Sequence, residues 1–358
     1  MKYFLITSKH HDGFALWPTD VSTYDVVDAT PFGRDILGEL AEACEKYGLA
    51  LGFYYSHWQD WGHPGGAMPP WPTGRKQFDR EPVVEQPTDE EFEQYWQSIS
   101  LPQVIELIER YEPDFLWFDN WKQADLLTEE RLNELIATVR THAPKTLINS
   151  RIGTTWNHPD GDIHVDFLSS GDNEFPDERI PRIWETSGTM QRSWGHHKLD
   201  PGWKPVSQLL RHLVDNASRG GNYQLNVGPM GDGSFPEPAR RRLREIGSWM
   251  SINGEAVYGT DPVNLPEFEW GRLTGKQVED TYRLYVHIYD WPENRSLVIP
   301  ALETQPSKAF LLESGFPVDV ASRNTGLELL LPVSQAPDER ITVLVLEFPE
   351  NPANSTSP

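Results

Sequence analysis

Cysteine is almost absent from this sequence, which has a single thiol, Cys44, among 358 residues. One thiol excludes an intrachain disulfide and any metal site built from several cysteines. No apolar run approaches the roughly 20 residues that a membrane-spanning helix requires. Basic residues are also scarce, 31 Lys and Arg against 54 Asp and Glu, which gives a net charge of −23. This balance argues against a nucleic-acid partner, because binding phosphate needs clustered cationic side chains.

Tryptophan, in contrast, is abundant: 14 residues, most of them in the first two thirds of the chain. The simplest interpretation is a core rich in large aromatic side chains. The alternative is a carbohydrate site, in which flat aromatic faces stack on the apolar face of a sugar ring. Both can hold together, because ligand pockets combine aromatic walls with a few polar groups.

Up to about residue 252, short apolar runs alternate with segments of helical period. The predicted strands are 3–8, 49–56, 114–119, 146–150, 163–168, 182–186 and 223–227. The predicted helices are 34–47, 88–111, 128–142, 205–218 and 237–252. This alternation predicts a parallel sheet covered by helices. The Pro-, Gly- and Trp-rich stretch 59–88 is expected to be a long functional loop.

After residue 260 the helical periods vanish, and apolar runs recur between Pro, Gly and Asn clusters. That pattern predicts an antiparallel β-sandwich. We therefore expect a catalytic α/β domain over 1–260, a sandwich over 261–348 and a disordered Pro- and Ser-rich tail over 349–358.

Polar and aromatic candidates fall at the predicted carboxyl ends of the strands. In chain order they are His10, His11, Asp12, Tyr54, Tyr55, Asp119, Arg151, Glu174, Trp184, Glu185 and Asn226. A (β/α) barrel gathers its active site at that face from several strands at once, so the placement favours a barrel over a doubly wound open sheet.

Paired carboxylates at such a face fit glycoside hydrolysis, in which one attacks the sugar or activates water and the other protonates the departing oxygen. Asp119 is the better nucleophile, since it closes a strand between Trp117 and Trp121, although it could instead cap a helix. For the second carboxylate, segment 171–179 offers four acids, and the residues alone leave the choice open. The pair His10 and His11 is a weak metal candidate, because adjacent side chains on an extended segment face opposite ways.

The ordered motifs of the chain resemble those of the α-L-fucosidases of glycoside hydrolase family 29. The matching segments are YFLITSKHHDGFALW (3–17), RDILGELAEACEKYGLALGFYYS (34–56), PDFLWFDNW (113–121), NSRIG (149–153), GDNEFPDERIPRIWETSGTMQRSWGHH (171–197), LLRHLVDNASRGGNYQLNVGPMGDG (209–233) and INGEAVYGT (252–260). The resemblance implies a TIM barrel with a following β-sandwich, and a retaining hydrolase that releases α-L-fucose from fucosylated glycans. It implies no metal and no organic cofactor.

The resemblance also implies roles for individual residues. The nucleophile corresponds to Asp119. The fucose pocket corresponds to His10, His11, Tyr54, Trp117 and Arg151, with Trp194 near the sugar methyl group. For the acid/base, an ungapped match to the family motif gives Asp177, whose side chain is one methylene shorter than the family's Glu. We expect Glu174 to serve instead, with Asp177 and Glu178 as alternates.

Family members carry on the order of a hundred residues before the KHHDGF strand, including the first barrel unit. The seven predicted strands are one short of the eight of a closed barrel. We therefore expect a barrel that lacks its first unit within this chain, and the two rival functions are an impaired fucose-binding protein and a glycosidase of other specificity. The start of the chain shows no signal peptide, but location and oligomeric state stay open, because a missing start would have included any such signal.

Overall fold

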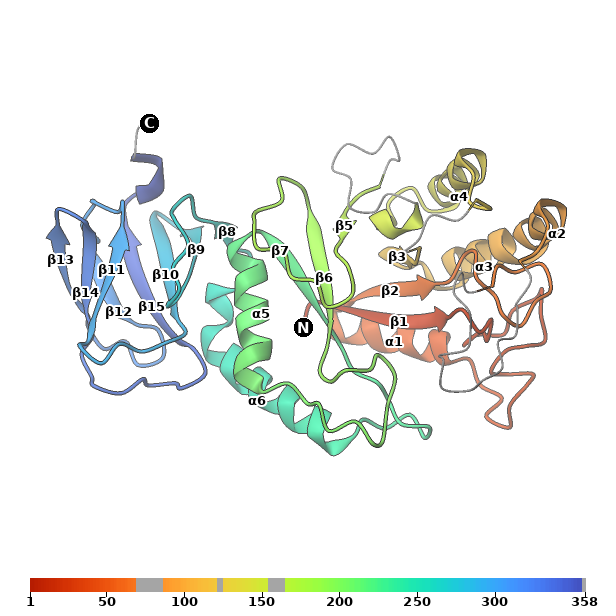
Figure 1. Cartoon of the computed structure of the whole chain (residues 1–358), viewed down its shortest axis with the longest axis horizontal. Helices are drawn as coiled ribbons and strands as arrows, with labels where there is room; N and C mark the ends of the chain where they lie inside the picture. The colour runs from red at the N-terminus through yellow and green to blue at the C-terminus, as the bar shows by residue number, and fades with distance from the viewer. Residues whose placement is uncertain (69–85, 121–124, 154–164, 356–358) are drawn as a thin grey trace, which may run out of the picture. The chain divides into compact units, whose positions relative to one another are not determined.

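The computed structural model describes residues 1–68, 86–120, 125–153 and 165–355, and the chain forms two compact units, Met1–Ser169 and Ser170–Pro358 (Figure 1). Trp121 and the first residues of the predicted strand 163–168 lie outside the described part, as does most of the predicted loop 59–88. The two units are considered in turn.

Four parallel strands form the sheet of the first unit, in the order β1-β2-β3-β4. They are β1 (Tyr3–Lys9), β2 (Ala50–Tyr55), β3 (Phe115–Phe118) and β4 (Leu147–Ile148), and a short β5 (Leu168–Ser169) follows. Phe53 pairs with Ile6 on one side and with Leu116 on the other. Because the strands are parallel and in register, their carboxyl ends meet at one edge. The apolar runs in the sequence thus predicted β1 to β4 correctly, whereas the strand predicted over 163–168 shares only Leu168 with β5.

The helices of the first unit are α1 (Ile36–Tyr47), α2 (Asp89–Tyr95), α3 (Leu101–Tyr111) and α4 (Glu129–His142). Asp35 caps α1 by accepting from the Gly38 amide, and Gly48 ends it in the left-handed conformation at φ 64°. The predicted helix 88–111 is interrupted by a π-helical turn, η2 (Trp96–Ser100). This turn places Ser100 so that its hydroxyl donates to the carbonyl of His57, 2.6 Å away.

The second unit begins with a parallel pair, β6 (Trp184–Thr189) and β7 (Gly221–Asn226), each followed by a helix, α5 (Val206–Ser218) or α6 (Glu237–Asn253). One expectation is wrong here: Trp184 and Glu185 begin β6 and do not end it. The strand continues through Thr186, Ser187 and Gly188, whose small polar side chains resemble a turn in the sequence. Trp184 is fully buried, and its indole packs against Gly221, where a Cβ would come within 2.3 Å of the ring.

Antiparallel strands fill the rest of the second unit. They are β8 (Asp261–Pro262), β9 (Gly271–Val278), β10 (Thr281–Ile288), β11 (Ser296–Pro300), β12 (Lys308–Leu311), β13 (Asp319–Arg323), β14 (Gly326–Leu330) and β15 (Thr342–Phe348). One sheet has the order β12-β15-β10-β9-β8 and the other β11-β14-β13. Buried side chains such as Leu284, Leu329 and Leu346 form the core.

The segment expected to be a disordered tail, 349–358, contains one short regular element. Pro352–Ser355 form a 3₁₀ turn. It begins where the Asn351 side chain accepts from the amide of Ala353, 3.0 Å away, and Ala353 is buried.

Candidate active site

The carboxyl ends of β1, β2 and β3 bring six predicted residues together in the first unit. His10 and His11 follow β1, Tyr54 lies in β2, Trp117 lies in β3, Asp119 follows β3, and Arg151 lies in the 3₁₀ turn η3 (Ser150–Ile152). All but His10 are buried.

Asp119 is the centre of this group, and its side chain points inward with the residue only 8 % exposed. The Tyr54 hydroxyl donates to Asp119 Oδ2 at 2.7 Å, and Arg151 Nη2 forms an ion pair with Asp119 Oδ1 at 2.6 Å. The Trp58 indole donates to the backbone carbonyl of Asp119 at 3.0 Å. A cation and a hydroxyl thus compensate the buried negative charge, and the backbone beneath it is fixed.

Flat side chains surround this carboxylate. The rings of His10 and Tyr54 stack with centroids 5.2 Å apart and planes 4° apart. Tyr54 in turn stacks on Trp117, 5.4 Å away, and the Arg151 guanidinium lies 4.8 Å from the Trp117 ring centre. The site therefore offers broad apolar faces beside a carboxyl group, the combination that a sugar ring with its hydroxyls requires.

His11 is neutral in this site. Burial, followed by the nearby His10, Arg151 and Lys9, lowers the pKa of His11 to about 2. Its Nδ1 lies 2.7 Å from the Ser56 hydroxyl, and that hydroxyl donates its only proton to the carbonyl of Gln59, 2.7 Å away. Ser56 must therefore accept from His11, so Nδ1 carries the imidazole proton. Nε2, 3.7 Å from Asp119 Oδ2, is left as a hydrogen-bond acceptor facing the site.

Beneath the site, a buried ion pair holds the segment that follows β2. Lys9 is fully buried, and its ammonium group donates to Asp60 at 3.2 Å and to the Tyr95 hydroxyl at 3.0 Å. Burial lowers the pKa of Lys9, and the Asp60 carboxylate opposes this effect. The sequence reasoning missed Ser56, Trp58, Lys9 and Asp60, although Lys9 and Ser56 directly adjoin the predicted motifs HHDGF and YY.

The loop with the acid/base candidates lies in the second unit, and β6 fixes its backbone. Asn173 adopts the left-handed conformation at φ 56°, and its amide donates to the carbonyl of Ser187 at 3.0 Å. Its side-chain oxygen accepts from the amide of Thr189 at 2.9 Å and from Lys204 Nζ at 2.8 Å. The hydroxyl of Thr186 donates to the carbonyl of Glu174 at 3.2 Å.

The acidic side chains of this loop differ in their surroundings. The exposed carboxylate of Glu174 lies over Gly171, where a Cβ would come within 2.2 Å of Glu174 Oε2. Phe175, the next residue, stacks on His212 with ring centres 3.8 Å apart. Asp177 and Glu178 are also exposed. Trp194 is 38 % exposed, and its carbonyl accepts from Asn226 at 2.7 Å.

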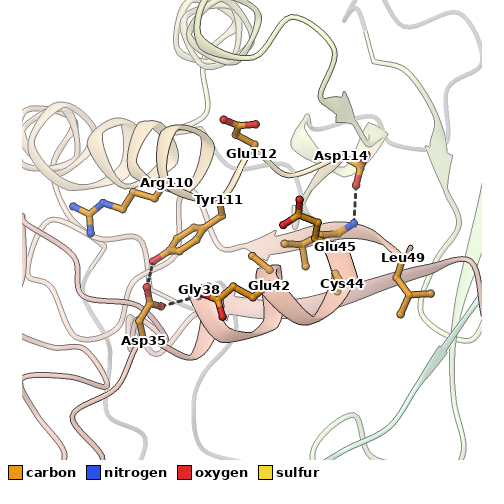
Figure 2. A pocket seen from close by; sticks show the side chains of 12 residues that line it. Asp35, Gly38, Glu42, Cys44, Glu45, Leu49, Arg110, Tyr111, Glu112 and Asp114 are labelled. Carbon is orange, nitrogen blue, oxygen red and sulfur yellow. Dashed lines mark hydrogen bonds between the residues drawn. The ribbon is translucent and has the colours of Figure 1, made fainter. Parts of the chain in front are cut away.

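A cavity of about 680 Å³ in the first unit is lined by none of the residues around Asp119 (Figure 2). It is lined by α1, by Arg110 and Tyr111 at the end of α3, and by Leu51 and Asp114 at the amino ends of β2 and β3. The Asp119 group occupies the opposite, carboxyl ends of the same strands, so this cavity is not the site. In the part of the chain that the structure describes, no three His, Cys, Asp or Glu side chains form a group that could hold a metal ion. No described helix is long and apolar enough to cross a membrane.

A buried, compensated carboxylate among aromatic faces, at the carboxyl ends of parallel strands, defines a carbohydrate-processing enzyme of the α/β class. The α-L-fucosidase family model matches residues 1–255. The chain therefore belongs to the α-L-fucosidase family, glycoside hydrolase family 29.

Individual relatives agree with this assignment. The mouse tissue α-L-fucosidase is 27 % identical over 357 residues, which cover 97 % of this chain and 72 % of the relative. The bovine tissue enzyme is 30 % identical over 87 % of this chain, and the chain spans only 63 % of that relative's length.

Solved structures show the same similarity. The α-L-fucosidase isoenzyme 1 of Paenibacillus thiaminolyticus has a TM-score of 0.81 at 32 % identity, covering 97 % of this chain and 83 % of that chain. A GH29 α-L-fucosidase of Bacteroides thetaiotaomicron, trapped as a covalent intermediate with 2-fluoro-fucosyl fluoride, has a TM-score of 0.82 at 26 % identity, covering 96 % and 78 %. The chain shares the α/β fold of these GH29 enzymes, in which a TIM barrel precedes an antiparallel β-sandwich.

Proposed function

We propose that this chain is a retaining exo-α-L-fucosidase that releases fucose from fucosylated oligosaccharides or glycoconjugates, with Asp119 as its nucleophile. The observation that supports this most strongly is the environment of Asp119. Its buried carboxylate accepts from Tyr54 and pairs with Arg151, which fixes the position of its two oxygens. The family relative trapped as a covalent intermediate supports the retaining course.

In the first step, an oxygen of the Asp119 carboxylate attacks the anomeric carbon as the glycosidic bond breaks, and an acid donates a proton to the leaving oxygen. In the second step, the conjugate base of that acid removes a proton from water. The water oxygen attacks the anomeric carbon, and the bond from that carbon to Asp119 breaks. His10, Tyr54 and Trp117 provide stacking faces, and His11 Nε2 accepts from a sugar hydroxyl. Trp194 contacts the methyl group of fucose.

For the acid/base we propose Glu174, with Asp177 and Glu178 as alternates. The support is the anchoring of its backbone, since Glu174 lies between Asn173, which is bonded to β6, and the stacked Phe175. A proton donor needs a fixed position, because small displacements cost large factors in rate. Azide should restore activity to Glu174→Ala but not to Asp177→Ala or Glu178→Ala. If azide restores activity only to Asp177→Ala or only to Glu178→Ala, that residue is the acid/base and the assignment to Glu174 is wrong.

The nucleophile is tested by incubating the enzyme with 2-fluoro-fucosyl fluoride and locating the adduct by peptide mass spectrometry. We expect one fluorofucosyl group on Asp119, none in Asp119→Asn, and an unchanged adduct in the control Asp28→Asn, which alters an exposed carboxylate. An adduct elsewhere would refute the assignment. No adduct, with fucose still bound, would favour a binding protein. Faster cleavage of nitrophenyl galactoside than of nitrophenyl fucoside would indicate a different specificity.

We further propose that residues 1–260 act as the catalytic domain and 261–348 as an accessory sandwich, and that the barrel takes one more strand–helix unit from a segment outside these 358 residues. A TIM barrel has eight parallel strands, whereas the described residues before β8 contain seven, β1 to β7. If the isolated chain is monomeric, melts cooperatively and has full fucosidase activity, the additional unit is unnecessary and this proposal is wrong.

A further inference from the structure

We propose that Trp61 is a stacking platform for the leaving-group sugar, in a subsite adjacent to the fucose. The inference rests on the proposed function, because it needs a fucoside bound at Asp119. Trp61 is not one of the six residues grouped around Asp119. The inference assigns a substrate class, in which fucose is linked to a second pyranose sugar and not to a small alcohol.

Trp61 is an exposed aromatic side chain held beside the site. It is 43 % exposed, and its ring centre lies 5.8 Å from that of His11, with the planes 46° apart. On the same imidazole ring, Nε2 of His11 is 3.7 Å from Asp119 Oδ2. The Trp61 amide donates to the carbonyl of His11 at 2.7 Å, which couples the two residues through the backbone. Trp61 therefore lies one side chain away from the proposed nucleophile, at the solvent side of the buried His11.

The segment that presents Trp61 is rigid. Its neighbour Asp60 accepts from the buried Lys9 and from the amide of Gly62 at 3.1 Å. Gly13, at φ 85°, packs so closely that a Cβ would come within 2.1 Å of Asp60. The Ala67 amide donates to the carbonyl of Trp58 at 2.9 Å and closes the loop. Because this backbone is already fixed, a ligand at Trp61 would not have to order the loop, and such preorganisation favours a binding role over a merely tolerated surface position.

The aromatic surface continues beyond Trp61. A Cβ at Gly62 would lie 3.5 Å from the Tyr24 ring, and Tyr24 is 48 % exposed. Phe14 packs edge-on against Tyr24 with centroids 5.1 Å apart. The segment that carries Trp61 thus passes close to a second exposed aromatic side chain, and exposed aromatic side chains grouped at a site margin are typical of a surface that a ligand covers.

The chemistry of the ligand follows from this surface. Pyranoses present a flat patch of C–H groups, which an aromatic face can cover while the ring hydroxyls remain in water. No charged side chain is needed for such a contact. A sugar aglycone matches Trp61 in shape and polarity, whereas a fluoride leaving group makes no contact with it.

The test compares two substrates that share the fucose and differ in the aglycone. One is α-L-fucosyl fluoride. The other is whichever fucosyl disaccharide the unaltered enzyme cleaves fastest in a panel of linkages to galactose and N-acetylglucosamine. For Trp61→Ala we expect kcat/KM to fall about tenfold or more for the disaccharide, the effect of about 1.4 kcal/mol of lost binding. We expect a change below about twofold for the fluoride and for inhibition by free fucose. Trp61→Phe should give an intermediate kcat/KM for the disaccharide. The control Tyr47→Ala, which removes an exposed aromatic side chain at the end of α1, should leave kcat/KM unchanged for both substrates.

Equal losses on both substrates would show that Trp61 supports the fucose site itself, and no loss on either would show that it binds nothing. Both results overturn the proposal. If the unaltered enzyme fails on the fluoride and forms no adduct with the fluorinated inhibitor, the proposed function fails, and the subsite with it. If it cleaves the fluoride normally, only the subsite is under test.

Discussion

The Ser56 hydroxyl determines which nitrogen of His11 carries the proton. Removing this hydroxyl should change the tautomer of His11 while every side chain around Asp119 stays in place. In the native site the Ser56 hydroxyl accepts from the N–H of His11 Nδ1 and donates its own proton to the carbonyl of Gln59. In Ser56→Ala, a proton on Nδ1 would have no partner in a buried site. The imidazole can escape that state by moving the proton to Nε2, which faces Asp119 Oδ2.

The magnitudes decide between these two states. A buried donor without a partner costs about 1–3 kcal/mol, whereas the two neutral imidazole tautomers differ by less, so the proton should move. His11 then donates toward the nucleophile and no longer accepts from a sugar hydroxyl. Loss of one such hydrogen bond, together with a weakened nucleophile, corresponds to a fall in kcat/KM of roughly tenfold to a hundredfold.

Nitrogen-15 NMR of the His11 ring reports the tautomer directly, and turnover of nitrophenyl fucoside reports the rate. Ser100→Ala is a matched control, because it also removes a buried serine hydroxyl, the one that donates to the His57 carbonyl, but does not contact His11. We expect the tautomer to change only in Ser56→Ala. An Nδ1 proton that stays in place in Ser56→Ala, with kcat/KM unchanged, would refute the reasoning.

Two further predictions concern stability. Burial as the main cause lowers the pKa of His11 to about 2 and those of His57 and His287 to about 3, from 6.5. Below pH 6.5 these histidines therefore bind protons in the unfolded chain but not in the folded chain. As the pH falls from 6.5 to about 3, each of them should lower the free energy of unfolding by about 1.4 kcal/mol per pH unit. Urea unfolding at several pH values measures this slope, and His287→Gln should reduce it by one residue's share. Lys9→Met should cost about 3–5 kcal/mol, because it leaves the buried Asp60 carboxylate without its cation. Lys9→Met with Asp60→Asn should recover part of this loss, and a cost no larger than that of the exposed Lys46→Met would contradict the prediction.

The sequence was sufficient for the parallel strands of the first unit because burial on both faces leaves a readable mark. LGFYY and FLWF are apolar without interruption, and their ends are closed by polar residues. The same rule failed at β6, where Thr186, Ser187 and Gly188 lie inside the strand. Such side chains are small enough to pack closely beneath a neighbouring element, and period alone does not distinguish them from a turn. The π-helical turn at Trp96–Ser100 was likewise not predicted, because the apolar spacing over 88–111 predicts one continuous helix.

The candidate site divides in the same way. Asp119, Tyr54, His11 and Arg151 were predicted because each stands at or just beyond a strand end, and their mutual contacts follow from the parallel register. Lys9 was not predicted, because a lone lysine in a sequence is most simply a surface residue. Its burial depends on Asp60 and Tyr95, which are 51 and 86 residues away in the chain. Partners at that separation become visible only when the loop that brings them together is known.

The acid/base assignment shows what backbone geometry adds to a set of chemically similar candidates. Glu174, Asp177 and Glu178 are all exposed carboxylic acids, so neither hydropathy nor charge ranks them. The left-handed Asn173 separates them, because its side chain and amide bond to β6 and prevent the adjacent residue from sliding along the strand. In an exposed loop a carboxyl group has many rotamers, and its proton reaches the leaving oxygen only from a few of them. Fixing the backbone on both sides of Glu174 narrows that search. Arg219 holds the carbonyl of Pro176, just before Asp177, at 2.9 Å, so azide rescue of the three alanine variants decides between these acids.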